Sequence, residues 1–587
     1  MLALTARLRA APFPETAAEL YGLTNIWSIH LKFTDENWSA LEPKNSGGMY
    51  TARPWRVPPA DILVPTFMNE ADKNRDRILS REEFAAAGQK WFAAWDGEKS
   101  GYISLEQLRE GLNSTFMPFG GRMNLQGPEG KRNGIASRLG FEFEYTPADL
   151  QFESNTFVKV AARYKGNGTY LESQRGEKRP LKVDLNKYVK GQDLAGVTTL
   201  NLHNRVTDGS WMNESLALRL YRDAGAPAPR TAFARLQVTN GKFDGTYSGL
   251  YCLVENVDRH FTREYFGTRG GALFKPVTPD LFGDLGGDWE AYQQTYDAKT
   301  ALTTADKSRL LELCRLVSKA NDATFAARIA EFIDLEAFAR YMAVTVFLSD
   351  LDGILGPGQN FYLYLHPTTG KFHFIAWDQD HSFGQMRGTQ EQRETLSIDA
   401  PWQGQNRFLE RIFNVDAFKR LYRARLDEFS KTLFKPERFY QQVNQLAPII
   451  RPAIKEESSE KLEDFDFLVT GGNPELSGYN SRRLGPGKPI KGFVGPRAKS
   501  IAEQLAGKAK GSRVPGDGIG PGMTLGAAFM AALDRDKDNE LTAEEVSEGF
   551  VKWFESWSES SAPGVSEQQL RDGINRDLAP LLPWPAR

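Results

Sequence analysis

The two ends of this chain carry copies of one sequence module. Phe67 in the first copy matches Phe529 in the second, and the segment Leu108–Asn113 matches Leu570–Asn575. Each matched pair is separated by the same number of residues, so the copies align without a gap. A repeat this constant in length is typical of a duplicated module. It therefore predicts a chain of several units, with a different central domain between the two copies.

Each copy begins with an acidic loop between two apolar helical patterns. Oxygen-bearing groups occupy alternating positions of a loop of about 12 residues, as in an EF-hand, where they surround Ca²⁺ and a final Glu closes the site. The candidate ligands are Asp72, Asn74, Asp76, the Ile78 carbonyl, Ser80 and Glu83 in the first copy, and Asp534, Asp536, Asp538, the Glu540 carbonyl, Thr542 and Glu545 in the second. The sixth position favours a positive φ, and it holds Arg77 in one loop and Asn539 in the other. We expect both loops to bind Ca²⁺, the second more tightly; the alternative is an acidic loop without metal.

The second loop of each copy is a poor calcium site. The loop 96–107 ends in Gln107, and an amide cannot supply a bidentate pair of negative oxygens. In the other copy the ligand positions have lost their carboxylates and the sixth position is proline, at Ser558, Ser560, Ala562 and Pro563. We expect these two loops to be weak or empty.

The composition is that of an ordinary soluble protein. The chain has 587 residues, 41% hydrophobic and 25% charged, with a formal net charge of −2. This allows several domains and a large core, and it predicts no nucleic-acid partner. No apolar run approaches the roughly 20 residues of a membrane-spanning helix. Cys252 and Cys314 are expected to be two buried thiols, with a single disulfide as the alternative.

A predicted β-hairpin gathers acidic residues in the centre of the chain. The alternating segments Asn360–Leu365 and Lys371–Trp377 flank a loop that ends at Gly370. Carboxylates stand before and after this hairpin, at Asp350, Asp352, Asp378 and Asp380. A hairpin brings its two ends together, and clustered carboxylates persist where a cation offsets their repulsion. Solvated aspartates at strand ends are the alternative.

The residues around this hairpin resemble a family signature. The motifs are Asp352-Gly353, Asn360-Phe361-Tyr362-Leu363-Tyr364, Trp377-Asp378-Gln379-Asp380 and Ser382-Phe383-Gly384. They resemble the C-terminal lobe of the spore-coat CotH kinase family. The resemblance implies an α+β fold with two lobes, similar to an atypical protein kinase, and phosphoryl transfer that uses ATP with Mg²⁺ or Mn²⁺. One departure is Asp350, which stands where the family pattern has Asn before x-Asp352.

The preceding region resembles the N-terminal lobe of the same family. Lys165-Gly166-Asn167-Gly168-Thr169 is similar to its glycine-containing turn, and a Lys-rich strand carrying Lys182 follows. A glycine turn between strands can bring backbone N–H groups to a phosphate. The resemblance implies that Lys165 and Lys182 bind phosphates, that Glu214 orients Lys182 from a helix at 211–224, and that Glu255 lies near the hinge. These residues could instead be ordinary surface charges, with Lys178 or Lys275 in the phosphate role.

The resemblance also implies roles for the acidic residues of the hairpin. Asp352 would accept or orient a hydroxyl proton, while Asp378 and Asp380 hold the metal. Asn360 would assist as a neutral ligand of the metal or as a group that orients the base. No Ser-His-Asp or Cys-His motif offers a competing chemistry.

The sequence therefore predicts a kinase-like domain with calcium modules on both sides. The expected parts are 1–60, with a strand at 25–33 that could join the kinase-like lobe, an EF-hand pair at 61–116, the kinase-like domain at 137–510, and a second pair at 523–577. The expected activity is phosphoryl transfer to protein Ser or Thr hydroxyls. The alternatives are a non-catalytic calcium-binding scaffold and transfer of another group, such as a nucleotidyl group.

The expected location is outside the cell or in its envelope. Calcium loops with weakened ligands suit the millimolar Ca²⁺ found there, and the family resemblance implies the same setting and a protein substrate. The first residues could be the remnant of a secretory leader, although Arg7 and Arg9 interrupt the apolar stretch.

Overall fold

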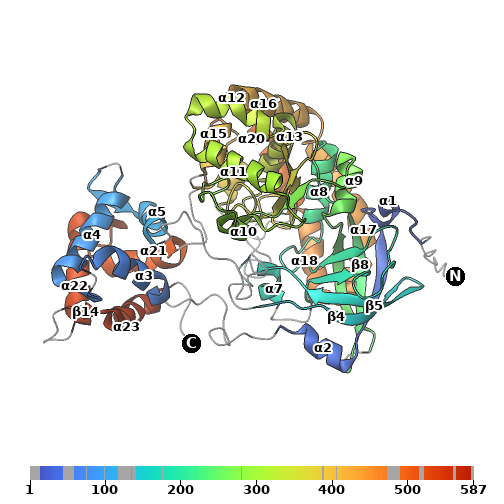
Figure 1. Ribbon diagram of the computed structural model, residues 1–587, viewed down its shortest axis with the longest axis horizontal. Helices are drawn as coiled ribbons and strands as arrows, with labels where there is room; N and C mark the ends of the chain where they lie inside the picture. Colours follow the sequence, from blue (N-terminus) through green and yellow to red (C-terminus); the bar gives the residue numbers. More distant parts are fainter. Residues whose placement is uncertain are drawn as a thin grey trace.

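The computed structural model describes residues 13–43, 59–74, 76–97, 99–116, 134, 136, 141–173, 178–242, 244–278, 280–386, 389–404, 406–471, 489–514, 521–558 and 564–582. The possible leader lies outside these ranges, as do most of the linker expected after residue 116 and the Ser560, Ala562 and Pro563 positions. No helix within the ranges combines the length and the apolar character needed to cross a membrane. Figure 1 shows a β-rich lobe, a helical lobe above it and a smaller helical unit at the left.

The β-rich lobe is a closed barrel of seven strands. Their order is β1 (Ile26–Lys32), β4 (Thr146–Phe152), β5 (Asn155–Tyr164), β6 (Leu181–Asp184), β7 (Thr199–His203), β9 (Thr246–Val254) and β8 (Thr231–Thr239). The N-terminal strand β1 closes the barrel, because it pairs with β4 on one side and with β8 on the other. Alternation in β1 buries Trp27, Ile29 and Leu31, as the period of two predicts.

Five short helices accompany the barrel. They are α1 (Ala17–Leu20), α2 (Asp35–Leu41), α7 (Gly168–Ser173), α8 (Asn213–Asp223) and α9 (Arg259–Phe266). Helix α7 begins inside the glycine-containing turn, so this turn leads into a helix rather than directly into the next strand. Helix α8 is buried along most of its length and has Glu214 in its first turn. One hydrophobic core continues from α8 into the helical lobe, which joins the two lobes.

The helical lobe is built around the predicted hairpin. Strands β11 (Phe361–Leu365) and β12 (Phe372–Ala376) pair as expected, and β10 (Ala272–Phe274) adds a third strand. The helices are α10 (Glu290–Tyr296), α11 (Thr304–Lys319), α12 (Asp322–Phe332), α13 (Leu335–Leu348), α14 (Gln390–Glu394), α15 (Arg407–Ile412), α16 (Asp416–Lys431), α17 (Pro436–Glu457), α18 (Ser459–Thr470) and α20 (Ile490–Leu505). Helices α12 and α13 are separate, because the chain leaves the helical conformation at Ile333 and the Asp334 side chain caps the next helix.

The modules at the two chain ends form one helical unit, which we call the terminal unit. It contains α3 (Pro59–Ala71), β2 (Ile78–Leu79), α4 (Arg81–Trp95), β3 (Tyr102–Ser104) and α5 (Leu105–Phe116), together with α21 (Pro521–Leu533), β13 (Glu540–Thr542), α22 (Ala543–Trp557), β14 (Val565–Ser566), α23 (Glu567–Leu578) and the short 3-10 helix η1 (Ala579–Leu581). Helix α3 packs on α23, α4 on α22 and α5 on α21 (Figure 1). All of these helices contribute to a single hydrophobic core.

The expectation of two separate flanking pairs is therefore corrected. The loop strands pair between the copies and not within them: β3 pairs with β13, and β2 with β14. Leu541 faces Ile103 and Val565 faces Leu79 across these pairings, and all four side chains are buried. The physical reason is that each copy presents an apolar face that the other copy covers.

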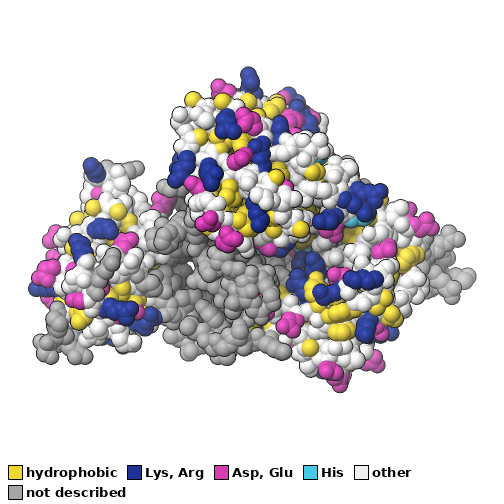
Figure 2. Space-filling model, viewed as in Figure 1, with side chains coloured by type: hydrophobic (Ala, Val, Ile, Leu, Met, Phe, Trp, Pro, Cys, Tyr) yellow, Lys and Arg dark blue, Asp and Glu magenta, His cyan; other side chains and the backbone are white. Residues whose placement is uncertain are grey.

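The visible surface carries charges of both signs, and the two cysteines form no disulfide. Figure 2 shows Lys and Arg side chains interspersed with Asp and Glu over the helical lobe at the top of the view. Cys252 and Cys314 are both buried and free, as expected.

Candidate active site between the two lobes

Asp352 lies in the turn between α13 and the hairpin, with its carboxylate held on both oxygens. The Asn360 side-chain amide donates to Oδ2 at 2.9 Å, and the Gln359 amide donates to Oδ1 at 3.2 Å. Asn360 adopts a φ of 60°, a left-handed conformation that Asn tolerates better than most residues. The first strand of the hairpin thus begins with residues that orient this carboxylate. Asn360 is thus a direct hydrogen-bond donor to the Asp352 carboxylate.

Asp350 is buried beside Asp352 and stabilises the same turn. Its carboxylate accepts from the Gln379 side chain at 3.0 Å and from the Asp352 backbone N–H at 3.2 Å. A Cβ atom at Gly353 would lie 2.5 Å from an Asp350 oxygen, so the glycine leaves room for this carboxylate. Burial, with a smaller contribution from Asp352, raises the pKa of Asp350 to about 7. The residue that departs from the family pattern is thus a buried, hydrogen-bonded acid.

Asp378 and Asp380 lie directly after the second strand of the hairpin. The side chain of Asp378 is 34% exposed, and its pKa is raised by burial of the carboxylate and by Asp380. Asp380 is buried, accepts a hydrogen bond from the Thr207 hydroxyl and receives the Asn213 side-chain amide on its backbone carbonyl. These two bonds connect the Asp378–Asp380 segment to the residues that precede and begin α8.

His381, directly after Asp380, is affected by the acidic residues on both sides of the hairpin. Its Nε2 lies 4.0 Å from Asp380 Oδ2. Burial lowers the pKa of His381, but Asp380, Asp352, Asp378 and Asp350 all raise it, and the net shift is upward. Aspartates from both sides of the hairpin thus lie close enough to His381 to act on its charge.

Basic side chains from the barrel and the helical lobe lie near Trp377, the residue that precedes Asp378. Lys165 Nζ lies 5.1 Å from the centre of the Trp377 ring, and Lys275 Nζ lies 5.6 Å from it. Burial lowers the pKa of Lys165 to about 7, against the opposing effect of Asp378, and lowers that of Lys182 to about 8, with added repulsion from Arg163. Desolvated cations that repel one another form a site suited to an anion.

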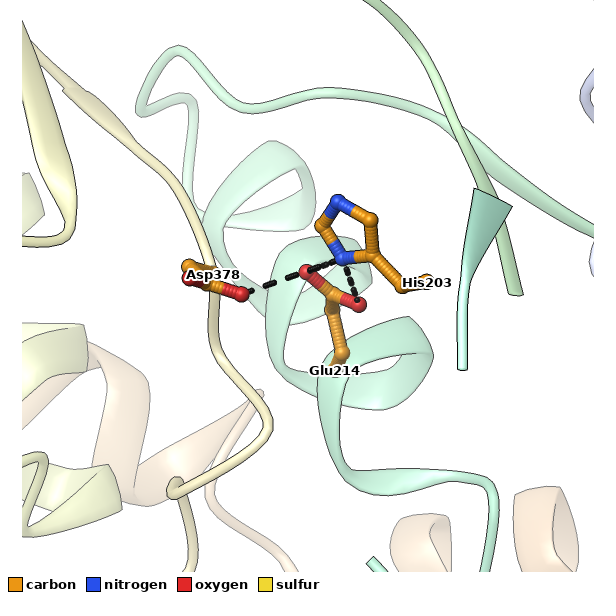
Figure 3. Close-up of side chains that lie close together, drawn as sticks. All are labelled: His203, Glu214 and Asp378. Carbon is orange, nitrogen blue, oxygen red and sulfur yellow. Dashed lines mark hydrogen bonds and ion pairs between the residues drawn. The ribbon is translucent and has the colours of Figure 1, made fainter. Parts of the chain in front are cut away.

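The expected pairing of Glu214 with Lys182 is corrected by the structure. Glu214 is fully buried and accepts from Arg205 Nη1 at 2.5 Å, and its Oε2 lies 3.0 Å from His203 Nδ1. Lys165, and not Lys182, reaches this group, through a short hydrogen bond to His203 Nε2. Burial raises the pKa of Glu214, and Arg205 opposes that shift. Figure 3 shows His203 beside Glu214, with Asp378 approaching from a separate segment.

The other expected basic and acidic residues have partners of their own. Lys178 forms a buried ion pair with Glu457 of α17 at 2.8 Å, which makes it a link between the barrel and α17. Glu255 follows β9, where the chain leaves the barrel, and its carboxylate binds Arg230. Arg230 also binds Glu264 of α9. Arg230 therefore links Glu255, just after β9, to α9.

The sequence reasoning missed the residues between β7 and α8. His203, Arg205 and Asp208 are buried, and Arg205 Nη2 binds Asp208 at 2.8 Å. The sequence feature that could have indicated these residues is the polar run at 203–210, which lies between a buried strand and a helix that starts with Asn-Glu. Non-glycine residues of this run and of the segments at the two ends of the hairpin have a positive φ, and such strained conformations gather at functional sites: Arg205, Asn360, Asp378 and Phe383.

A family model described as CotH kinase protein matches residues 162–466. The chain belongs to this CotH kinase family. The inner spore coat protein H of Bacillus subtilis (strain 168) is 27% identical over 279 residues, which covers 46% of this chain and 73% of that protein. The match begins within β5 and ends within α18, so the CotH region includes the lysines, α8 and the hairpin aspartates.

Outside the CotH region, the terminal unit holds the two acidic loops. In the loop after α21, Asp534, Asp536 and Asp538 place one carboxylate oxygen each within 4.8 Å of one another. The Glu545 carboxylate reaches back to the backbone N–H groups of Arg535 and Thr542, at 3.0 and 2.9 Å. The loop is thus curled around a group of carboxylates.

The loop after α3 has the same shape. Glu83 accepts from the backbone N–H groups of Lys73 and Ser80, both at 3.0 Å. Arg77 has a φ of 63° and Asn539 a φ of 66°, so the sixth position is left-handed in both loops, as expected. In the loop 96–107, Asp96 accepts from the Ser100 and Gly101 backbone, both at 2.8 Å, while Gln107 takes the place of the final Glu.

Proposed function

We propose that this CotH protein transfers a phosphoryl group from ATP to a protein hydroxyl in a metal-dependent reaction. The observation that carries the proposal is the placement of Lys165 and Lys275 over the ring of Trp377, the residue that precedes Asp378, with Lys182 near enough to repel Lys165. Nucleotide phosphates would offset the repulsion among the lysines, and a hard cation would offset the repulsion between the aspartates.

The residues fit Mg²⁺ or Mn²⁺, because Asp378 is a partly exposed carboxylate whose pKa is raised by burial and by Asp380. Asp378 and Asp380 would hold the ion, which when bound supplies positive charge to the phosphates. Lys165, Lys182 and Lys275 bind and orient the phosphates. Asp352, held by Asn360 and Gln359, accepts the proton from the attacking hydroxyl.

Incubation with ATP labelled at either the γ or the α position tests this activity. We expect γ label on a generic acceptor protein, only with Mg²⁺ or Mn²⁺. Asp378→Asn should abolish metal-dependent nucleotide binding and transfer, whereas Asp352→Asn should keep binding and lower transfer by about 10²–10⁴-fold. Asp322→Asn, whose side chain is 95% exposed on α12, is the control. Transfer of α label would favour nucleotidyl transfer, and no binding of Mg·ATP would favour a non-catalytic scaffold.

We also propose that the terminal unit binds Ca²⁺ in the loops Asp72–Glu83 and Asp534–Glu545. One support is the curled shape of both loops. The other is the repulsion among like charges at Asp536. The backbone amide of Asp538 lowers the pKa of Asp536, but burial and the neighbouring carboxylates raise it, and the net shift is upward. Because the two copies share one core, calorimetry should use the whole chain. We expect two sites, with Glu83→Gln and Glu545→Gln each removing one. Glu544→Gln, next to Glu545 but outside the ligand set, should bind normally.

We further propose that the protein acts on a protein substrate outside the cell or in the envelope. A spore coat protein is among its relatives, and loops with weakened ligands suit millimolar Ca²⁺. Immunodetection in medium, envelope and cytosol fractions of the native host tests this location. Recovery from the cytosol alone would contradict it.

A further inference from the structure

The His203 side chain lies between the lysine and the glutamate that the site brings together. It stands at the end of β7, with Lys165 from the end of β5 on one side and Glu214 from α8 on the other. Lys165 Nζ contacts Nε2, and Nδ1 lies 3.0 Å from Glu214 Oε2 and 3.8 Å from Asp378 Oδ1 (Figure 3). The lysine therefore connects to the glutamate through an imidazole.

The charge of Glu214 is neutralised by another group. Arg205 binds Glu214 at 2.5 Å, and Arg205 itself is fixed by Asp208. The backbone amide of Gln379, the residue after Asp378, also favours the charged form of Glu214 and so lowers its pKa. Glu214 thus has a buried guanidinium as its partner, and it needs no direct contact with a lysine.

We propose that His203 is a positioning residue that aims Lys165 at the phosphates of the bound nucleotide. This inference rests on the proposed function, and it identifies the side chain that orients the phosphate-binding Lys165 of that site. A neutral imidazole offers one donor and one acceptor on opposite sides of one rigid ring. Nε2 faces the Lys165 ammonium, which can only donate, and Nδ1 faces the Glu214 carboxylate, which accepts; the ring that suits both partners therefore carries its hydrogen on Nδ1 and accepts from Lys165 at Nε2.

The surroundings hold the imidazole in this orientation. The Trp377 ring meets His203 edge to face, with 5.6 Å between ring centroids, and the same indole carries Lys165 over its face. The side chain of His203 is only 9% exposed. Trp377 directly precedes Asp378, so the placement of Lys165 and that of the proposed metal ligand depend on the same short segment.

The arrangement makes a direct spectroscopic prediction. In the nucleotide-free protein, long-range ¹H–¹⁵N correlation of the histidine rings should show His203 as the neutral tautomer with hydrogen on Nδ1. The chain has six histidines, and the signal that disappears in His203→Gln assigns the residue. A tautomer with hydrogen on Nε2, or an imidazolium, would overturn the inference. The former would instead suit coordination of an ion by Nδ1 together with Glu214 and Asp378.

A pair of substitutions tests the positioning role. Gln can accept from Lys165 through its carbonyl and donate to Glu214 through its amide, whereas Leu has similar bulk and can do neither. We expect His203→Leu to weaken Mg·ATP affinity and to raise KM for ATP by roughly tenfold or more, with a smaller change in kcat. His203→Gln should recover at least half of that loss on a logarithmic scale. His373→Leu, a histidine of β12 outside the site, should bind ATP normally.

The outcomes separate this inference from the proposed function. Equal losses in the Leu and Gln variants, or no loss in either, would overturn the positioning role while wild-type transfer still supports the enzyme. Wild-type protein that binds Mg·ATP without transferring label would overturn the enzyme, and the affinities of the variants would still decide on His203. Wild-type protein that binds no Mg·ATP would overturn both.

Discussion

Lys165 and Lys182 occupy positions that disfavour their charge. Burial lowers their pKa values to about 7 and about 8, while lysine in an unfolded chain stays protonated to much higher pH. The unfolded state therefore binds more protons between these values and about pH 10, so these two residues make stability rise with pH through that range. Below these pKa values the two lysines are charged although they are buried, and a bound anion would offset the free-energy cost of that charge.

Binding of Mg·ATP near pH 8.5 should be accompanied by proton uptake, because phosphates favour the charged forms of Lys165 and Lys182. Calorimetry in two buffers of different ionisation enthalpy measures the uptake, which we expect to be on the order of one proton. Near pH 6 both lysines are already protonated, and uptake should vanish. Lys182→Met should reduce the uptake, and identical binding enthalpies in the two buffers would contradict the assignment.

The buried Asp350 leads to a prediction of opposite sign. Its pKa is raised to about 7, so the folded state holds a proton that the unfolded state loses near pH 4, and stability falls as pH rises through this window. Asp350→Asn keeps an acceptor for Gln379 and removes the charge. We expect it to stabilise the protein by about 1–4 kcal/mol near pH 8 and by less near pH 5. Thermal unfolding at both pH values is the measurement; a gain that does not change with pH would refute the explanation.

Single residues were predictable where a local pattern placed them. Asp352, Asn360, Asp378 and Asp380 meet because a hairpin necessarily brings its ends together. The lysine was harder to choose, because Lys165 and Lys182 lie on neighbouring strands of a barrel, and which of them approaches Glu214 depends on strand register and barrel closure. His203 could not be found from spacing, since its partners come from two other elements.

At the scale of elements, the terminal unit is joined by two very short strand pairs. The residue at the eighth position of each loop is buried in these pairs, as Leu79, Ile103, Leu541 and Val565. The module repeat predicted the helices and loops on each side. It did not predict the exchange of partners, because pairing within a copy and pairing between copies bury the same kinds of side chain.

Leu541→Ala removes a fully buried side chain from the β3–β13 pairing. We expect a loss of about 2–5 kcal/mol in the stability of the terminal unit, because the transfer free energy is lost and a cavity remains. Denaturant unfolding followed by tryptophan fluorescence includes the signal of this unit, whose core contains four of the 12 tryptophans of the chain, Trp91, Trp95, Trp553 and Trp557. Leu581→Ala, at a side chain that is 40% exposed, is the control and should cost little. Equal effects of the two changes would argue against the buried pairing.

At the scale of the whole molecule, the module that follows β1 and the module that follows the CotH region hold each other. Phe67, Phe84 and Trp91 of the first module all lie within about 6 Å of the Phe550 ring of the second. The chain therefore leaves this unit after α5 and returns to it at α21, while β1, which precedes α3, belongs to the barrel. The module repeat predicted a central domain between the copies, but the joining of the two copies is a tertiary contact between distant segments.

Cutting the chain between Val514 and Pro521 should not release the C-terminal segment. A protease recognition sequence inserted there allows specific cleavage, after which we expect both fragments to elute together in size-exclusion chromatography under native conditions. Phe550→Asp places a charge in the shared core and should let the cleaved fragment dissociate. Separation of the fragments without this substitution would show that the covalent connection, and not the shared core, holds the segment.

The exchange of partners also sets an order of events during synthesis. Helices α3 to α5 are translated before the CotH region, and the helices that cover their apolar faces follow it, with α21 beginning roughly 400 residues after the end of α5. At about 5–20 residues per second, this leaves aromatic side chains such as Phe67 and Trp91 without their final cover for about 20–80 s. The nascent chain thus carries this uncovered apolar segment throughout translation of the CotH region, and we expect chaperones to bind it during that time.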